Sequence, residues 1–277
     1  MRLTVVGTGL VGGSLAAVLR GLDEVDEVVG ADADDRSLAR ALERGLIDRA
    51  APSAGEAAEG ADIVVLAVPV SAIAAVAKEV GAVMTPGSVL TDVASVKARI
   101  VPLMEEAVQP GVTVIGGHPM AGSHEAGVEH ATPDLFVGAT YLLTPTVSTA
   151  AEAYRRLHGL VSRIGARILA VDPDRHDLLV AVVSHLPQLA ATTLMNLAAR
   201  RAHNEHAELL LLAAGGFRDA TRVAASNPDL WLDVCAENRG AIVEVLDDYR
   251  ERIGALRSLI AVSDEQGLRE ELAAARA

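Results

Sequence analysis

A glycine-rich turn near the start of the chain constrains its fold more than any other feature. Gly7-Thr8-Gly9-Leu10-Val11-Gly12 follows an apolar run at residues 2–6 and opens an apolar helical pattern at residues 10–20. In a G-x-G-x-x-G turn the first glycine permits the tight turn, the second lets a pyrophosphate approach the backbone, and the third lets helix and sheet pack closely. The turn therefore predicts a Rossmann-type dinucleotide-binding unit from the first residue on, with Gly7, Gly9, Leu10 and Gly12 at the cofactor.

An acidic residue and a proline extend the predicted cofactor site. Asp32 lies 20 residues beyond Gly12, where a carboxylate accepts hydrogen bonds from the adenosine ribose and repels a 2′-phosphate. Asp32 therefore favours NAD, whereas Arg36 is able to pair with a 2′-phosphate and keeps NADP as the less favoured alternative. Val68 and Pro69 end a further apolar run at the carboxyl edge of the sheet, where such folds bind ligands; a strand that merely stops at proline is the alternative.

The order of hydrophobic patterns divides the chain in two. Short apolar runs first alternate with helical periodicity, which is typical of βαβ units. From Asp172-Pro173, a capping carboxylate followed by a proline suited to a first helical turn, the pattern is helical. We predict an α/β fold: a Rossmann-type parallel-sheet domain at 1–171, then an all-helical dimerisation domain at 172–277, since helices so rich in apolar positions suit a homodimer. The expected strands are 2–6, 27–31, 62–68, 89–92, 112–116, 140–143 and 167–171. The expected helices are 10–20, 36–44, 71–80, 95–108, 173–200, 204–214, 228–236, 238–262 and 264–275.

Composition and charge exclude several classes of function. The formal net charge is −13 and no cluster of Lys and Arg stands out, which disfavours a nucleic-acid partner or an anionic membrane. The single cysteine, Cys235, excludes an intramolecular disulfide and suits a reducing compartment. The apolar N-terminus is too rich in glycine for a signal peptide, and no unbroken run of about 18 apolar residues appears. We expect a cytoplasmic protein without a membrane span, and the sequence predicts no metal site.

Two polar segments follow predicted strands at the sheet edge that holds the glycine turn. They are Asp92–Lys97 and Gly116–Ser123. A histidine in a Gly/Pro-rich loop is a reasonable general base because its pKa lies near working pH, and oxidation of an alcohol needs a base for the hydroxyl proton. His118 is therefore the candidate base, with a structural role in its loop as the alternative. Ser95 is a weaker candidate that equally suits a turn or a helix cap.

Five segments occur together along the chain: GTGLVGGS, DVASVK, GGHPMAGSHEAGVEHA, SHLPQ and GGFRDATRVAASNPDLW. Their combination and order resemble the prephenate/arogenate dehydrogenases of tyrosine biosynthesis, from residue 1 to about residue 260. The HPMAG and GFRDATRVA segments are far more specific than the glycine turn. The resemblance implies a helical domain that pairs two subunits. It also implies oxidative decarboxylation of a cyclohexadienol, prephenate or arogenate, whose ring becomes aromatic.

The resemblance also implies roles for individual residues. His118 accepts the proton of the ring hydroxyl, and Ser95 hydrogen-bonds the same hydroxyl near the nicotinamide. Arg222 grips a substrate carboxylate, from its own chain or from a partner chain, and Arg218 adds positive potential if this stretch is helical. His185 matches a further active-site histidine, with packing between helices as its alternative.

Two positions depart from the family's pattern. His124, next to Ser123 in a loop expected to contact the substrate, stands where some members carry an acidic residue near the substrate's side chain. It therefore bears on the choice between the keto acid of prephenate and the amino acid of arogenate. Gln188 stands where the usual HLPH form has its second histidine, which leaves the role of that helix end open.

Two other functions stay as alternatives. A Rossmann-plus-helical dehydrogenase acting on a 3-hydroxy acid or an imine predicts a catalytic lysine on the helix after the domain boundary, and residues 172–200 contain no lysine. A non-enzymatic NAD-binding sensor predicts the loss of polar loop groups, whereas Ser95 and His118 are both present.

Overall fold

The computed structural model of the chain describes residues 1–122 and 125–276. By their internal contacts these residues form two compact units. The first comprises Met1–Asp177 and Ala225–Glu237, and the second comprises Leu178–Ala224 and Asn238–Ala277. The first unit thus includes a segment, 225–237, that the sequence pattern assigns to the helical domain.

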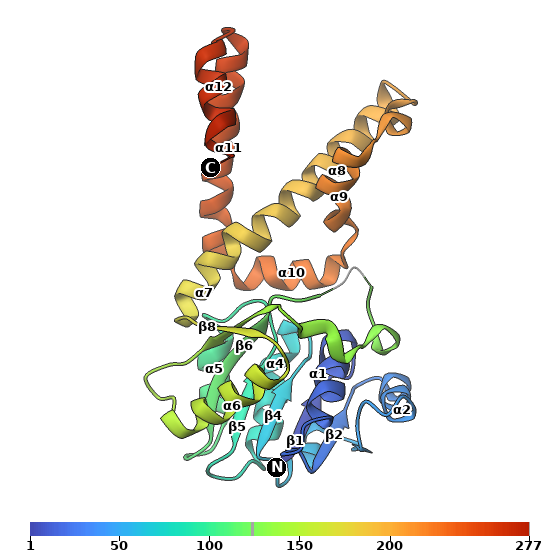
Figure 1. The fold of residues 1–277 in the computed structure, drawn as a ribbon, viewed down its shortest axis with the longest axis vertical. Coiled ribbons are helices and arrows are strands. Elements are labelled where there is room, and N and C mark those ends of the chain that lie inside the picture. Colours follow the sequence, from blue (N-terminus) through green and yellow to red (C-terminus); the bar gives the residue numbers. More distant parts are fainter. Residues whose placement is uncertain (123–124, 277) are drawn as a thin grey trace. The chain divides into compact units, whose positions relative to one another are not determined.

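One eight-stranded sheet forms the centre of the first unit (Figure 1). Its strands are β1 (Arg2–Val6), β2 (Glu27–Ala31), β3 (Arg49–Ala50), β4 (Ile63–Leu66), β5 (Val89–Asp92), β6 (Thr113–Pro119), β7 (Thr140–Thr144) and β8 (Arg167–Ala170). The strand order is β3-β2-β1-β4-β5-β6-β7-β8, and every neighbouring pair is parallel except β6 and β7. This mostly parallel sheet confirms the predicted fold class, and the order reverses at β1, where open α/β sheets bind their ligands.

Most helices of this unit alternate with the strands, and the last two follow β8. They are α1 (Leu10–Arg20), α2 (Asp35–Glu43), α3 (Ala54–Ala58), α4 (Val70–Gly81), α5 (Ile100–Ala107), α6 (Ala151–Arg163), α7 (Pro173–Val180) and α10 (Pro228–Glu237). One buried cluster joins leucines of α1 and α6 to Leu3 and Val5 of β1. Thr4 alternates with these two residues and donates from its hydroxyl to Ala57 O at 2.6 Å. Because successive side chains of a strand point to opposite faces, α3 covers the other face of the sheet.

The chain between β5 and α5 is irregular, with a bend at Ser95 and a turn at 98–99, although the sequence predicts a helix over 95–108. α5 begins only at Ile100. The Lys97 ammonium binds the carbonyl oxygens of Ala94 and Val96 at 2.8 and 2.9 Å, and these are oxygens that a helix needs for its own hydrogen bonds. The N–H of Ala98, which would bond Ala94 O in a helix, instead donates to Asp177 at 3.0 Å.

A buried ion pair fixes the carboxyl ends of β5 and β6. Lys97 Nζ lies 2.5 Å from Asp92 Oδ2, and both side chains are fully buried. The Asp92 carboxylate also accepts the N–H of Ala94 at 2.9 Å and that of Gly117 at 3.1 Å. Burial lowers the pKa of Lys97, and the Asp92 carboxylate opposes that shift. The pair therefore ties its own loop to β6 one residue before His118.

Other differences from the sequence prediction lie in short or irregular elements. The helix expected over 204–214 is wrong: α8 (Leu186–Asn204) runs through its first residue, and a 3₁₀ turn at Leu209–Leu212 follows. Four consecutive leucines lack the spacing that gives an α-helix one apolar face. The sequence missed α6, the five-residue α3, the two-residue β3 and α9 (Gly215–Thr221), which begins at two glycines.

The second unit consists of helices joined by short turns, with no strand among the residues that the structure describes. It contains a π-helical turn at Ala181–His185, α8, α9, a 3₁₀ turn that starts at Arg222, α11 (Arg239–Ala261) and α12 (Glu265–Ala274). Within the described chain, the continuous helical stretch Pro173–Asn204 is long and apolar enough to cross a membrane by length and composition alone. The sequence prediction contains no such span, because the stretch is interrupted by polar residues.

Replacing Lys97 by methionine should strongly destabilise the protein. The change leaves the Asp92 carboxylate buried without its cation, which costs about 3–5 kcal/mol in comparable sites. Urea denaturation measures the free energy of unfolding. Lys78→Met is the matched control, since Lys78 is exposed on α4 and should change stability by less than about 0.5 kcal/mol. Equal stability of the two variants would contradict a structural role for the pair.

Candidate active site

The glycine turn forms an open cradle of backbone at the start of α1. Gly7 has φ +94°, and a Cβ there would lie 2.3 Å from Ala67 O. A Cβ on Gly12 would lie 1.9 Å from Gly7 O, whereas one on Gly9 would meet no atom of the described chain within 4 Å. Among the described residues no side chain caps the helix at Gly9, so its first N–H groups are offered to a ligand. These features fit the pyrophosphate of a dinucleotide.

Asp32 follows β2 and faces the glycine turn. Its Oδ2 accepts the backbone N–H of Thr8 at 2.6 Å and the Thr8 hydroxyl at 2.9 Å. Its side chain is partly exposed, so the carboxylate is able to accept further hydrogen bonds from a ribose. The side chain of Arg36 is exposed at the start of α2.

Val68 and Pro69 lie between β4 and α4, directly beside the glycine turn. The preceding residue, Ala67, donates its N–H to Val6 O at 2.7 Å and presents its own carbonyl to Gly7. Val68 is partly exposed and Pro69 is exposed. The structure thus brings Gly7, Val68 and Pro69 to one part of the sheet edge, as the sequence predicts.

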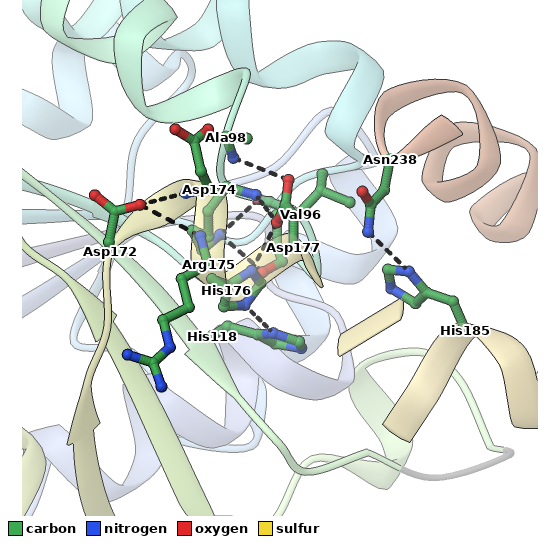
Figure 2. Close-up of polar contacts among 12 residues, drawn as sticks. Val96, Ala98, His118, Asp172, Asp174, Arg175, His176, Asp177, His185 and Asn238 are labelled. Carbon is green, nitrogen blue, oxygen red and sulfur yellow. Dashed lines mark hydrogen bonds and ion pairs between the residues drawn. The ribbon is translucent and has the colours of Figure 1, made fainter. Parts of the chain in front are cut away.

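His118 lies within strand β6, where the sequence predicts a loop. β6 pairs with β5 only through Ile115, then runs past the end of β5 and pairs with β7, with His118 opposite Leu142. Its side chain is buried, and its Nδ1 lies 2.8 Å from His176 Nε2 (Figure 2). A strand paired at this point positions the imidazole more rigidly than a loop would.

Ser95 lies in the loop that the buried ion pair shapes. It is partly exposed, and no hydrogen-bond partner of its hydroxyl occurs among the described residues. It precedes α5 by five residues and therefore does not cap that helix. The helix-cap alternative is thus wrong, and the role of Ser95 at a substrate hydroxyl stays a prediction.

His176 and Asp177 are the site residues that sequence reasoning missed. Both are buried on α7, and His176 Nδ1 lies 2.7 Å from Asp177 Oδ1. At the start of this helix Asp172 Oδ1 accepts the N–H groups of Asp174 and Arg175, as predicted for a cap. The adjacent His-Asp pair within the predicted helix 173–200 is the signal that could have found them, since such groups require partners if the helix packs them inward.

The remaining predicted site residues that the structure describes belong to the second unit. His185 is buried in the π-helical turn, with Nδ1 3.2 Å from Asn238 Nδ2, and Gln188 is buried one turn later. Arg218 and Arg222 are both exposed and lie four residues apart on one helical stretch. The stretch is helical, which is the condition under which Arg218 and Arg222 share one face, and the substrate roles of these residues stay predictions. Ser123 and His124 lie outside the described residues.

Two family models together match most of the chain. The model described as "Prephenate dehydrogenase, nucleotide-binding domain" matches residues 15–170, and "Prephenate dehydrogenase, dimerization domain" matches residues 172–274. The first covers the sheet and its helices up to β8, and the second covers the helical part from α7 onward.

Individual relatives agree with these family models. The prephenate dehydrogenase of Bacillus subtilis is 32% identical over 96% of this chain and 72% of its own length. A crystal structure of prephenate dehydrogenase from A. aeolicus, in complex with hydroxyphenyl propionate and NAD+, has a TM-score of 0.93 and 29% identity, covering 100% of this chain and 96% of that one. Synechocystis arogenate dehydrogenase has a TM-score of 0.84 and 32% identity, covering 100% and 98%. The chain therefore belongs to the prephenate/arogenate dehydrogenase family.

Proposed function

We propose that the protein catalyses NAD-dependent oxidative decarboxylation of prephenate, arogenate or both, in tyrosine biosynthesis. The observation that carries this proposal is His118, a buried imidazole held on a paired strand at the sheet edge that also bears the glycine cradle. Family membership supports the same chemistry, and the solved relative with NAD+ and hydroxyphenyl propionate supports both ligand classes.

The reaction requires little covalent chemistry from the side chains of the protein. The nicotinamide, when bound, accepts the hydride from the ring carbon that bears the hydroxyl. As that hydride leaves, the bond to the ring carboxylate breaks, CO2 departs, and its electron pair completes the aromatic ring. His118 accepts the hydroxyl proton while the C–H bond breaks and returns it to the product oxygen, so no net proton is released. Ser95 orients the same hydroxyl by a hydrogen bond. The driving force is aromatisation, and the protein mainly orients the ring.

The cofactor proposal rests on the charge beside the adenosine end of the site. Asp32 faces the glycine turn, and a 2′-phosphate there would meet its negative charge. NAD is therefore the proposed cofactor. Arg36 is exposed nearby and supports a weaker use of NADP.

The substrate and assembly proposals rest on the helical part. Exposed Arg222 offers a planar guanidinium for bidentate binding of a carboxylate, and Arg218 adds a second positive charge on the same stretch. Apolar side chains such as Leu197 and Ile253 are exposed on α8 and α11. Together with the match to a dimerization domain, they support a homodimer through this domain.

Turnover by the purified protein tests the proposed function. With prephenate and NAD it should release CO2 and form NADH in equal amounts, and arogenate should be assayed beside it. Replacing NAD by NADP at equal concentration should lower kcat/KM, because of the Asp32 charge. Absence of turnover with both substrates and both cofactors would reject the function.

His118→Ala should lower kcat by about 100- to 10,000-fold, the usual contribution of a general base. The NAD dissociation constant, measured by fluorescence titration, should stay near that of the wild type because the variant leaves the glycine turn intact. His130→Ala is the control, since His130 is exposed. A kcat within twofold of the wild type would exclude His118 as the base.

Arg222→Ala should raise KM for the substrate by about 10- to 100-fold, since it removes a charge-assisted hydrogen-bonding group worth about 1.5–3 kcal/mol. Arg155→Ala, an exposed arginine of α6, is the matched control. Steady-state kinetics with varied substrate at saturating NAD measure both. An unchanged KM would refute carboxylate binding by Arg222.

A further inference from the structure

Three buried side chains of the first unit form a hydrogen-bonded line that ends at His118 (Figure 2). His118 Nδ1 lies 2.8 Å from His176 Nε2, and His176 Nδ1 lies 2.7 Å from Asp177 Oδ1. The exposed fractions are 7% for His118, 0% for His176 and 4% for Asp177. Burial at this level makes each hydrogen bond costly to leave unmade, so the line is a fixed part of the site.

Asp177, at the end of the line opposite His118, acts as a hydrogen-bond acceptor. Asp177 Oδ1 accepts the N–H of Lys97 at 2.8 Å, and Oδ2 accepts the N–H of Ala98 at 3.0 Å. A carboxylate whose two oxygens both accept backbone N–H groups acts as an acceptor towards its neighbours. The contact between Asp177 and His176 therefore requires the proton on His176 Nδ1.

The position of the proton on His176 in turn determines which nitrogen of His118, the proposed base, carries a proton. A neutral His176 with its proton on Nδ1 has a lone pair on Nε2, which accepts from His118 Nδ1. His118 then carries its own proton on Nδ1 and its lone pair on Nε2. If His176 were cationic, its Nε2 would donate, and the neutral His118 would have to carry its proton on Nε2. His118 is thus able to accept a proton at Nε2 only while His176 is neutral.

The charged groups around the His118 and His176 imidazoles favour a positive charge on this pair after His118 accepts a proton. On α7 the Asp177 carboxylate touches His176, and the Arg175 side chain is exposed. In the loop after β5 the Lys97 ammonium pairs with the Asp92 carboxylate of β5, so these two charges offset each other. Asp177 is therefore the anion in direct contact with the His176 ring, and through that ring it favours an imidazolium in the line.

We propose that His176 and Asp177 are positioning residues for His118. They fix its Nδ1–H tautomer and stabilise the positive charge that it gains from the substrate hydroxyl. In this step the substrate O–H bond breaks and the N–H bond at His118 Nε2 forms, while the Nδ1 proton stays hydrogen-bonded to His176. The inference rests on the proposed function, since it assumes that His118 is the base of the dehydrogenase.

Two substitutions at His176 test the assignment. His176→Leu removes the acceptor, so kcat should fall about 10- to 100-fold with KM changed less than threefold. His176→Gln supplies an amide oxygen that is able to accept from His118 Nδ1 and should recover most of that loss. In both variants the acid limb of the kcat/KM profile should move to lower pH, because the charged form of His118 loses its link to Asp177.

Controls separate this inference from folding and from the proposed function. His158→Leu and His158→Gln change an exposed histidine of α6 and should leave kcat and the pH profile unchanged. NAD affinity and the urea midpoint report whether each variant folds; if His176→Leu does not fold, His176→Gln decides by its pH profile. An unmoved acid limb in folded variants would overturn the inference, as would equal loss in Leu and Gln variants that bind NAD normally. Inactive wild-type protein would instead reject the proposed function.

Discussion

The buried ion pair between Asp92 and Lys97 is the constraint on which the catalytic edge of the sheet depends. Both side chains are fully buried, and the ammonium has three acceptors: Asp92 Oδ2 and the carbonyls of Ala94 and Val96. Removing two charges from water is expensive, and comparable buried pairs often add no net stability over apolar residues of the same volume. We infer that the benefit here is positional, because the pair holds the Ser95 loop out of a helix and holds Gly117 beside it.

The site is assembled from three segments that lie far apart in the sequence, and the buried ion pair helps to hold them together. The β5 loop supplies backbone N–H groups at residues 97 and 98, α7 supplies the carboxylate that accepts them, and β6 supplies His118. Each contact fixes the next, since Asp177 orients His176 and His176 orients His118. An imidazole held by a paired strand and by buried hydrogen bonds has little conformational freedom left to lose, which suits the base role proposed for His118.

Local sequence patterns predicted most of the fold but only part of the candidate site. The glycine turn, Asp32 and the alternation of strands and helices are short-range features, so β1, β2, β5 and α1 have the predicted bounds. His118 was found by its residue type, and its strand was predicted only as far as residue 116, because the extension to Pro119 depends on pairing with β7, which begins 22 residues after His118. Asp177 lies 80 residues from Lys97, and periodicity holds no information about such a contact. For the same reason a helix was predicted over 95–99, where a buried lysine overrides local propensity.

An acidic protein of this family must bind ligands that are themselves anions. With a net charge of −13, the long-range field of the chain repels a dinucleotide and a dicarboxylate, so binding has to rely on contacts at short range. The cradle at Gly9 meets this need with backbone N–H groups, which carry partial positive charge and no counter-ion. Several arginines are engaged by carboxylates, such as Arg20 by Asp48 and Arg40 by Glu129, whereas Arg222 is exposed. Binding of anionic ligands by this chain therefore requires local donors, and its net charge of −13 disfavours non-specific binding of other polyanions.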